Sequence, residues 1–285
     1  MNALLSYLWS AFSLTLTIFL TLFLPIIICC IILNLLAGEQ SKRWYMIGGW
    51  NGLLLISWLG TPIHELSHAV AAVIGGHQIK SMQLFKPDKR TGSLGYVVHT
   101  YDSDNLYQSV FGNSIIAIAP FFGGAIAIYL ILKLILPEFS LFAPEVPRIH
   151  QIISGDILNP RSYLMMGESI MAFLQYLFNS LINLNMLSDW RFYLAFFILW
   201  GIAVHLSPSA GDFSNFWQPM VFLIVFMTIL NLIILPLTQN SMDLVNSASG
   251  YIYLVMPILL LAIFISALGL IITMIIYSFV SLISG

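Results

Sequence analysis

The chain has very little charge for its length. Of its 285 residues, 8% are Asp, Glu, Lys or Arg, whereas 59% are hydrophobic and 20 are Phe. In a typical soluble domain about a quarter of the residues are charged, so this composition excludes an ordinary soluble domain. The sequence therefore predicts an integral membrane protein.

A strong net charge is also absent. The formal net charge is -2, and the 10 Lys and Arg residues are spread along the chain rather than clustered. A protein that binds nucleic acid or an acidic partner usually has clustered basic residues. We therefore expect no nucleic-acid partner. The hydrophobic composition instead predicts contact with the lipid bilayer.

Cysteine is nearly absent. The two cysteines, Cys29 and Cys30, are adjacent within an apolar run. A disulfide between adjacent residues is strained, so two free thiols are the better interpretation. This excludes a disulfide framework, and the cysteines do not identify a redox compartment.

Apolar runs are abundant, and several have the length and composition of a transmembrane helix. They cover residues 3–36, 45–74, 110–136, 163–187, 192–206, 219–237 and 251–283. The run at 163–187 contains Glu168 and several Gln and Asn residues, so it either spans with a polar face turned inward or lies at the interface. We expect an all-α polytopic membrane protein with about six or seven transmembrane helices, in a single domain over residues 1–285.

The most polar part of the chain, residues 77–107, lies between two of these runs. Short β-prone pieces at 81–85 and 93–101 flank a Pro-Asp-Lys-Arg-Thr-Gly turn signal, and this pattern predicts a small β-hairpin. Open strand edges are not tolerated in lipid. We therefore expect a membrane-associated hairpin, at the interface or in a protein-lined cavity.

Two histidines and a glutamate lie within the second apolar run. His64, Glu65 and His68 form the pattern His-Glu-x-x-His, which on a helix puts both imidazoles on one face at the spacing that a zinc ion needs. With the His and Glu content of this chain, chance gives roughly 0.002 such matches. The alternative is a pair of structural histidines bonded to polar neighbours, which is disfavoured because ionisable groups are costly at membrane depth.

Thr61 and Pro62 come just before the motif. Thr can cap a helix, and Pro fits the first turn of one. We therefore expect the motif helix to begin or to bend at this point.

A catalytic zinc site commonly has three protein ligands and leaves a fourth position for water. The candidates for the third ligand are Asp212, Asp189 and His205. Asp212 is preferred, because it follows a Pro- and Gly-containing break between two apolar runs. Its structural alternative is an N-cap on the helix that follows.

The motif belongs to a longer set of residues. The set comprises His64-Glu65-Leu66-Ser67-His68, Ala71-Ala72, Gly75-Gly76, Ile79, Leu84-Phe85, Gly112-Asn113 and Ala119-Pro120-Phe121-Phe122-Gly123-Gly124. It resembles the site-2 protease family of intramembrane zinc metalloproteases, particularly its compact bacterial members. A weaker likeness extends over residues 183–217. The resemblance implies a multi-pass protein of the bacterial cell membrane.

In that family a distant Asp, usually followed by Gly, completes the zinc site, and a β-hairpin pairs with an unwound substrate. The resemblance implies Zn2+ held by His64, His68 and Asp212, although Phe213 rather than Gly follows Asp212. It also implies an endopeptidase that acts on a membrane-protein or membrane-peptide substrate, with Glu65 as general base and acid.

Two other functions stay open on the sequence alone. A non-catalytic membrane-protein binder or chaperone would keep the scaffold without turnover. A transporter would use intramembrane His and Asp residues as an ion site, but it has no need of Glu65 beside a histidine pair.

These features divide the chain into four parts. They are the first span at 1–43, the motif helix, hairpin and third span at 44–136, the polar loop at 137–162, and the remaining helices, with Asp212, at 163–285.

Overall fold

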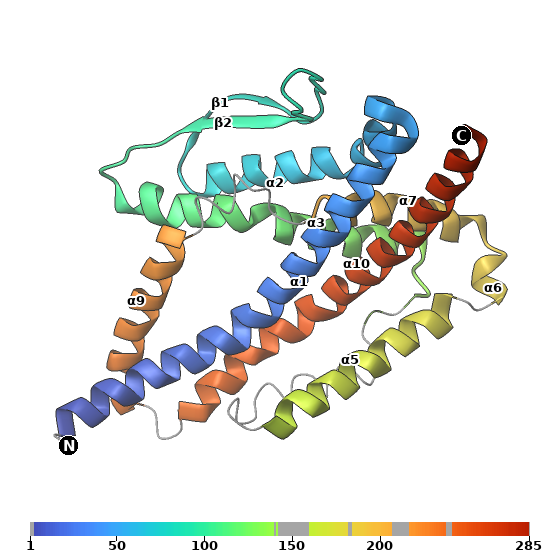
Figure 1. The fold of residues 1–285 in the computed structure, drawn as a ribbon. Helices are drawn as coiled ribbons and strands as arrows, with labels where there is room; N and C mark the ends of the chain where they lie inside the picture. The colour runs from blue at the N-terminus through green and yellow to red at the C-terminus, as the bar shows by residue number, and fades with distance from the viewer. Residues whose placement is uncertain are drawn as a thin grey trace. The chain divides into compact units, whose positions relative to one another are not determined.

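The computed structural model is mostly helical and describes residues 3–139, 141, 160–181, 184–206, 217–237 and 241–284. Its helices are α1 (Ala3–Ser57), α2 (Gly60–Ile74), the π-helix η1 (Tyr107–Gly112), α3 (Asn113–Ile135), α5 (Pro160–Leu181), α6 (Leu184–Leu187), α7 (Trp190–Val204), α9 (Trp217–Ile234), the 3-10 helix η2 (Leu235–Leu237) and α10 (Ser241–Ser284). Two strands, β1 (Gln78–Gln83) and β2 (Tyr96–Thr100), form an antiparallel hairpin (Figure 1). The predicted helical class and the predicted hairpin are confirmed. Most of the expected polar loop at 137–162 lies outside the described residues.

Three helical segments in the described part of the chain are long and apolar enough to cross a membrane. They are Leu4–Ser57, Tyr107–Ile135 and Leu254–Ile283. Two further apolar helices, Trp190–Val204 and Met220–Ile234, are shorter. These segments make membrane insertion possible.

Helix α1 is longer than the first expected span. The boundary expected after residue 43 does not end the helix. Gln40 explains the difference, because its buried side chain donates to Ser266 Oγ at 2.8 Å and accepts from Trp200 Nε1. A polar side chain that is paired in this way can remain within a continuous helix. The helical angles break later, at Gly49, where φ is 58° and ψ is -140°, a conformation that glycine adopts at little cost.

By their internal contacts the residues form two compact units. The first comprises Met1–Ile28, Ser140–Ile182 and Met220–Leu259, and the second comprises Cys29–Phe139, Asn183–Pro219 and Leu260–Gly285. We call the second the motif unit, because it contains His64, Glu65 and His68.

Within the first unit, α1 and α9 are joined by a buried polar pair. Asn231 Nδ2 donates to Thr15 Oγ1 at 2.9 Å. Leu14 and Ile18 pack against Met227 on the same pair of helices. A hydrogen bond between buried side chains fixes the register of helices that are otherwise apolar.

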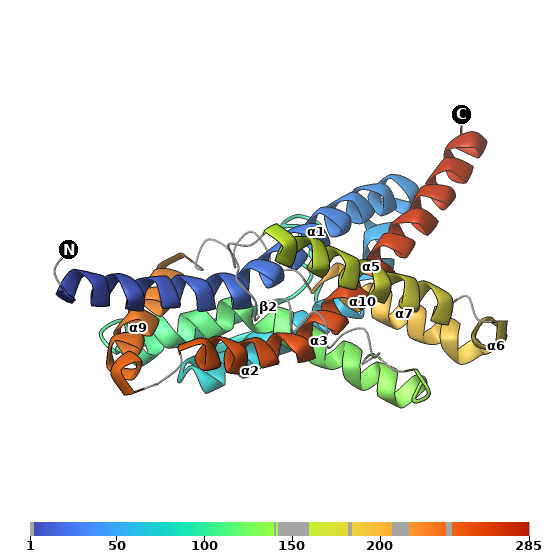
Figure 2. The ribbon, with the colours of Figure 1, turned by 90° about the horizontal axis from the view of Figure 1, so that it is seen from below.

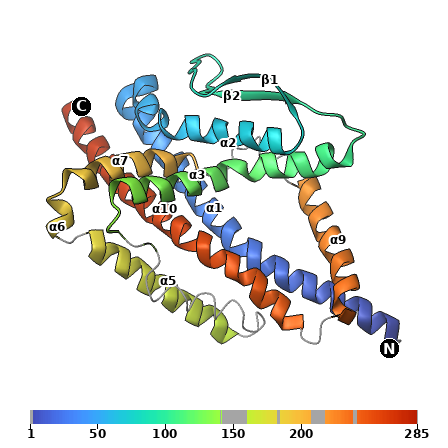
Figure 3. The ribbon, with the colours of Figure 1, turned by 180° about the vertical axis from the view of Figure 1, so that it is seen from behind.

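Helix α2 occupies the middle of three layers in the motif unit. The hairpin lies along one side of α2 and α3 lies along the other, as Figures 1 and 3 both show. Helix α3 also packs against α7, which Figure 2 shows from below. The motif helix is therefore held between elements from separate parts of the chain, and such support is what a precise site requires.

Glycines let the helices of the motif unit approach closely. A side chain at Gly123 of α3 would strike Ser67 on α2. At the start of α2, a side chain at Gly60 would strike the carbonyl of Gly201 on α7. Small residues therefore set the distances from α2 to both of these helices.

The hairpin has different bounds from those expected. Its first strand begins at Gln78, three residues before the expected piece at 81–85, because the chain turns sharply at Gly76, where φ is 76°. Its second strand lies inside the expected segment 93–101. The strand pair therefore starts almost directly after the motif helix.

Candidate metal centre

The structure brings the two motif histidines together on α2, whose first turn contains Pro62. Their ring centroids are 4.8 Å apart with an interplanar angle of 77°. The inner nitrogens, His64 Nε2 and His68 Nε2, are 3.2 Å apart. His68 is buried, whereas His64 and Glu65 are half-buried. One face of the helix thus presents two imidazole nitrogens at a common point.

Main-chain carbonyls hold the outer nitrogens of both rings. His64 Nδ1 lies 2.9 Å from the oxygen of His205, and His68 Nδ1 lies 2.9 Å from the oxygen of Ile116. A carbonyl oxygen only accepts hydrogen bonds, so we assign the ring hydrogen of each neutral histidine to Nδ1. Both Nε2 atoms are then acceptors, and a cation between them would stabilise this arrangement.

The histidine pair fits a zinc ion. Zinc binds His nitrogens at about 2.0–2.1 Å in tetrahedral geometry, which puts two ligating nitrogens about 3.3 Å apart. The separation of His64 Nε2 and His68 Nε2 is 3.2 Å. Zinc-ligating histidines also donate their other ring N–H to a carbonyl or carboxylate in most proteins, and both rings do so here. The alternative to a zinc ion is a proton shared between His64 Nε2 and His68 Nε2.

Glu65 lies against the main chain of the hairpin. A side chain at Gly95, the residue before β2, would come within 2.8 Å of Glu65 Cγ and within 2.8 Å of the Leu84 oxygen. Only a glycine allows the hairpin backbone to approach Glu65 this closely. The carboxylate that the motif supplies is therefore placed between α2 and the hairpin.

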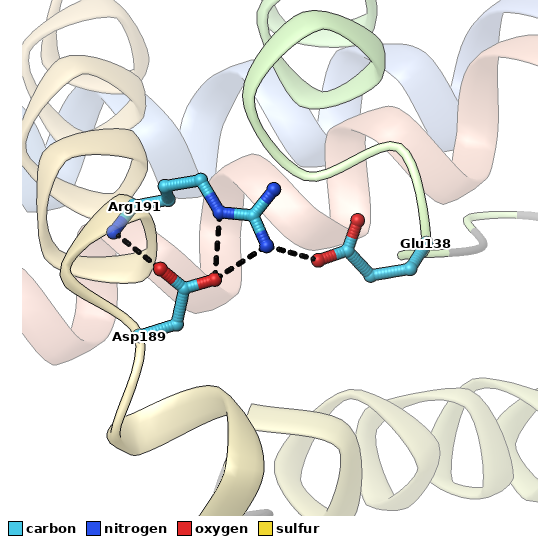
Figure 4. Close-up of polar contacts among 3 residues, drawn as sticks. All are labelled: Glu138, Asp189 and Arg191. Carbon is cyan, nitrogen blue, oxygen red and sulfur yellow. Dashed lines mark hydrogen bonds and ion pairs between the residues drawn. The ribbon is translucent and has the colours of Figure 1, made fainter.

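Asp189, one candidate for the third ligand, has a different role. It is the N-cap of α7, where its Oδ1 accepts from Arg191 N at 2.9 Å and its Oδ2 pairs with the guanidinium at 2.6 Å. The same guanidinium reaches Glu138 at 3.0 Å (Figure 4). The hydrogen bonds from Arg191 lower the pKa of the Asp189 carboxyl.

The position of Asp189 also separates it from the histidine pair. Asp189 precedes α7, whereas His205, whose carbonyl holds His64, follows its last residue. The helix between them has 15 residues, which corresponds to a length of about 22 Å. The structure thus does not bring Asp189 to the motif.

His205, another candidate ligand, contributes its main chain to the site. Its carbonyl oxygen faces His64, while its own Nδ1 lies 3.2 Å from the oxygen of Gly201. Asp212 lies outside the described residues, so its role stays a prediction. Within the described ranges, no group of three or more His, Cys, Asp or Glu side chains is arranged to hold a metal ion.

A second histidine pair lies just beyond the end of α2. His77 Nδ1 and His99 Nδ1 are 2.9 Å apart, and His77 Nε2 donates to the oxygen of Gln108 at 2.9 Å. The buried His77 ring stacks on Tyr101 with centroids 4.7 Å apart. Burial, and after it the neighbouring His77, lowers the pKa of His99. This pair ties β2 to the end of α2 and to η1.

The carbonyls of Ile116 and His205 were not among the predicted site residues. A main-chain oxygen occurs at every position, so neither the residue type nor its spacing marks one that will meet an imidazole. The Thr61 hydroxyl, which has no hydrogen-bond partner among the described residues, was likewise expected only as a helix cap.

Comparisons of the chain with protein-family models, with curated proteins and with solved structures give no match.

Proposed function

We propose that the chain is an intramembrane zinc metalloprotease, an endopeptidase that hydrolyses peptide bonds in membrane-embedded or membrane-proximal protein segments. The observation that carries this proposal is the histidine pair of α2, with inner nitrogens 3.2 Å apart and both outer nitrogens bonded to carbonyls. Such a pair is a donor set for zinc, and the residue after His64 is a carboxylate that can transfer protons. The resemblance to the site-2 protease family supports the same function.

Glu65 is the proposed general base and acid. A zinc ion held by His64 and His68 would supply a Lewis acid that polarises the scissile carbonyl. Glu65 takes a proton from the attacking water and later delivers it to the nitrogen of the leaving amine. The main chain at Gly95 lies close to Glu65 Cγ, which limits the positions open to this side chain.

Asp212 is the proposed third ligand. The chain that leads to it starts beside the histidine pair, because the carbonyl of His205 bonds to His64. Leu206 is the last described residue before that segment, and the six residues from there to Asp212 reach at most about 20 Å when extended. The histidine pair is within this reach, whereas Asp189 is fixed at the other end of α7, and this difference supports Asp212 over Asp189.

The hairpin is the proposed docking site for the substrate. Cleavage of a transmembrane helix requires local unwinding, which frees peptide groups that an exposed strand edge can pair. The hairpin consists of two strands, so each strand has one edge that is not paired within the sheet. Gly95 brings this sheet to Glu65. A substrate strand added to the sheet would therefore lie close to the carboxylate.

We further propose that the protein crosses the bacterial cell membrane about six or seven times. The three long apolar segments and the two shorter apolar helices support a multi-pass arrangement. Helix α2 has 15 residues, so its length of about 22 Å is less than the hydrocarbon thickness of about 30 Å. A short helix of this kind suits a site that lies within the membrane and reaches water.

Cleavage of a single-span membrane peptide in lipid nanodiscs tests the proposal. A panel of such peptides is incubated with zinc-loaded protein, and the products are identified by mass spectrometry. We expect cleavage that stops on chelation, returns with zinc and is abolished in Glu65→Gln. A zinc-loaded wild type that binds the peptides but cleaves none of them would point to a non-catalytic membrane-protein binder.

A further inference from the structure

Thr61 has a buried hydroxyl without a hydrogen-bond partner. It lies in the first turn of α2 and is 4% exposed, and its Oγ1 bonds to none of the residues that the structure describes. The expected capping role is not realised, because the N-cap is Leu59 and no side chain bonds there. A buried polar group left unpaired is destabilising, and in native structures it commonly holds a water or an ion.

Four other buried helix hydroxyls are satisfied within their own helix, and a fifth, Ser266, accepts from Gln40 on another helix. Each of the four donates to the carbonyl four residues before it: Thr15 to Ala11 at 2.9 Å, Ser57 to Leu53 at 2.8 Å, Ser169 to Met165 at 2.9 Å and Thr273 to Gly269 at 2.7 Å. Thr61 differs because the residue four before it is Ser57, the last residue of α1. The break between the two helices removes the usual acceptor, so the Thr61 hydroxyl is available to a group from outside α2.

Thr61 lies on the same face of α2 as the motif. At 3.6 residues per turn, Glu65 is about 40° from Thr61 around the helix axis and His68 is about 20° away on the other side. Residues four apart on a helix have Cβ atoms about 5–6 Å apart. This separation fits one water molecule between the Thr61 hydroxyl and the Glu65 carboxylate.

We propose that Thr61 is a positioning residue that holds a water molecule beside Glu65. This inference rests on the proposed function, because hydrolysis consumes one water for each peptide bond and Glu65 receives its proton. The Thr61 hydroxyl donates to the water oxygen, and the water in turn donates to the carboxylate. A water held in this way is oriented for proton transfer before the substrate is attacked.

The test compares variants that differ only in this hydroxyl. Thr61→Val keeps the side-chain volume and removes the hydroxyl, whereas Thr61→Ser keeps the hydroxyl. Thr61→Ala is measured in parallel, because Val puts a methyl group where the hydroxyl was, and Ala removes the hydroxyl without adding that group. Ser57→Ala is the matched control, since it removes a buried hydroxyl that already has its acceptor at Leu53. The measurements are kcat, KM, bound zinc and the thermal unfolding midpoint, with the zinc-loaded full chain in nanodiscs.

We expect kcat to fall at least about tenfold in Thr61→Val and Thr61→Ala, the loss that accompanies a misplaced reactant. KM and bound zinc stay at wild-type values in both, and Thr61→Ser and Ser57→Ala retain the wild-type kcat. A Thr61→Val protein with unchanged kcat overturns the inference, as does a raised unfolding midpoint, because removal of a hydroxyl that holds nothing is stabilising. Loss of zinc from Thr61→Val also overturns the inference, since the hydroxyl would then be needed for metal binding and not for holding a water.

Failure of the proposed function has a different signature. If the zinc-loaded wild type cleaves no peptide, the proposed protease function is wrong. The water beside Thr61 is then tested separately, by crystallography. A water within hydrogen-bond distance of both Thr61 Oγ1 and the Glu65 carboxylate upholds the inference. A protein group in that place contradicts it.

Discussion

The two histidine pairs of the motif unit differ in how the other nitrogen of each ring is held. In each pair two ring nitrogens approach closely, at 3.2 Å between His64 and His68 and at 2.9 Å between His77 and His99. In the motif pair, a carbonyl oxygen holds the outer nitrogen of both rings. In the second pair, the described residues supply such a carbonyl to His77 alone, from Gln108.

This difference decides what each pair can bind. His99 can keep its hydrogen on Nδ1 and donate it to His77, so the second pair is a neutral hydrogen bond. In the motif pair we assign both ring hydrogens to the outer nitrogens, so the two inner nitrogens are acceptors and would bind a shared cation. The carbonyls of Ile116 and His205, as well as the two histidines, therefore make the motif pair the better candidate for a metal site.

The largest expected effect is on metal binding. His68→Ala should reduce bound zinc from about one equivalent per chain to less than about a tenth, because it removes a ligand, and cleavage should be lost with it. His77→Ala, the matched change in the second pair, should retain the zinc. Metal analysis by plasma mass spectrometry of the purified proteins measures both. Equal zinc loss in the two variants would remove the distinction between the pairs.

The next effect separates metal binding from proton transfer. Glu65→Gln should lower kcat by about 10²–10⁴-fold, the usual contribution of general acid–base catalysis, while zinc stays bound. Glu138→Gln is the control, because this carboxylate pairs with Arg191 at the start of α7, and surface ion pairs contribute little. A quenched fluorescent peptide reports both rates. Substantial cleavage by Glu65→Gln would contradict the mechanism.

A smaller effect concerns the helix that supplies the Ile116 carbonyl. Gly123→Ala should destabilise the fold by about 1–3 kcal/mol, because the added methyl overpacks the contact between α3 and α2. Ser67→Ala in the same chain should recover part of this loss, since Ser67 is the group that the methyl would strike. Denaturant unfolding of the two single variants and the double variant gives the coupling energy. Strictly additive losses would argue against this contact.

The smallest effect is a pH dependence at the second pair. The pKa of His99 is lowered in the folded protein by burial and by His77. The unfolded chain therefore binds more protons as the pH falls below about 6.5, so the stabilising contribution is present above that value and is lost as the pH falls toward the folded pKa. Hydrogen exchange of β2, corrected for intrinsic rates, should quicken over this range in wild type and change less in His99→Gln. Identical profiles for the two proteins would count against a neutral contact.

The side-chain part of the site was predictable because helix periodicity alone brings His64 and His68 onto one face. The hairpin was predictable for a similar local reason, since a turn signal between β-prone pieces specifies a strand pair. The orienting carbonyls were not, because tertiary packing selects which main-chain oxygen meets each ring. The sequence thus reveals the candidate ligands, whereas the carbonyls that orient them depend on how α3 and α7 pack.

Two further residues show the same limit. Gln40 is polar and lies beyond the first apolar run at 3–36, yet it lies inside α1, where it bonds to Ser266 and Trp200. Asp189 has the right chemistry for a zinc ligand, but it caps α7 and pairs with Arg191. Residue type specifies what a side chain can bind, and long-range packing determines which partner it meets.

X-ray absorption spectroscopy at the zinc edge of the purified protein reports on the proposed metal site itself. We expect about one zinc per chain, with two imidazole nitrogens at about 2.0–2.1 Å. This signal should be largely lost in His64→Ala or His68→Ala, because these variants no longer retain zinc, and should remain unchanged in His77→Ala. A protein without stoichiometric zinc, or a zinc shell without imidazole nitrogens, would contradict the account.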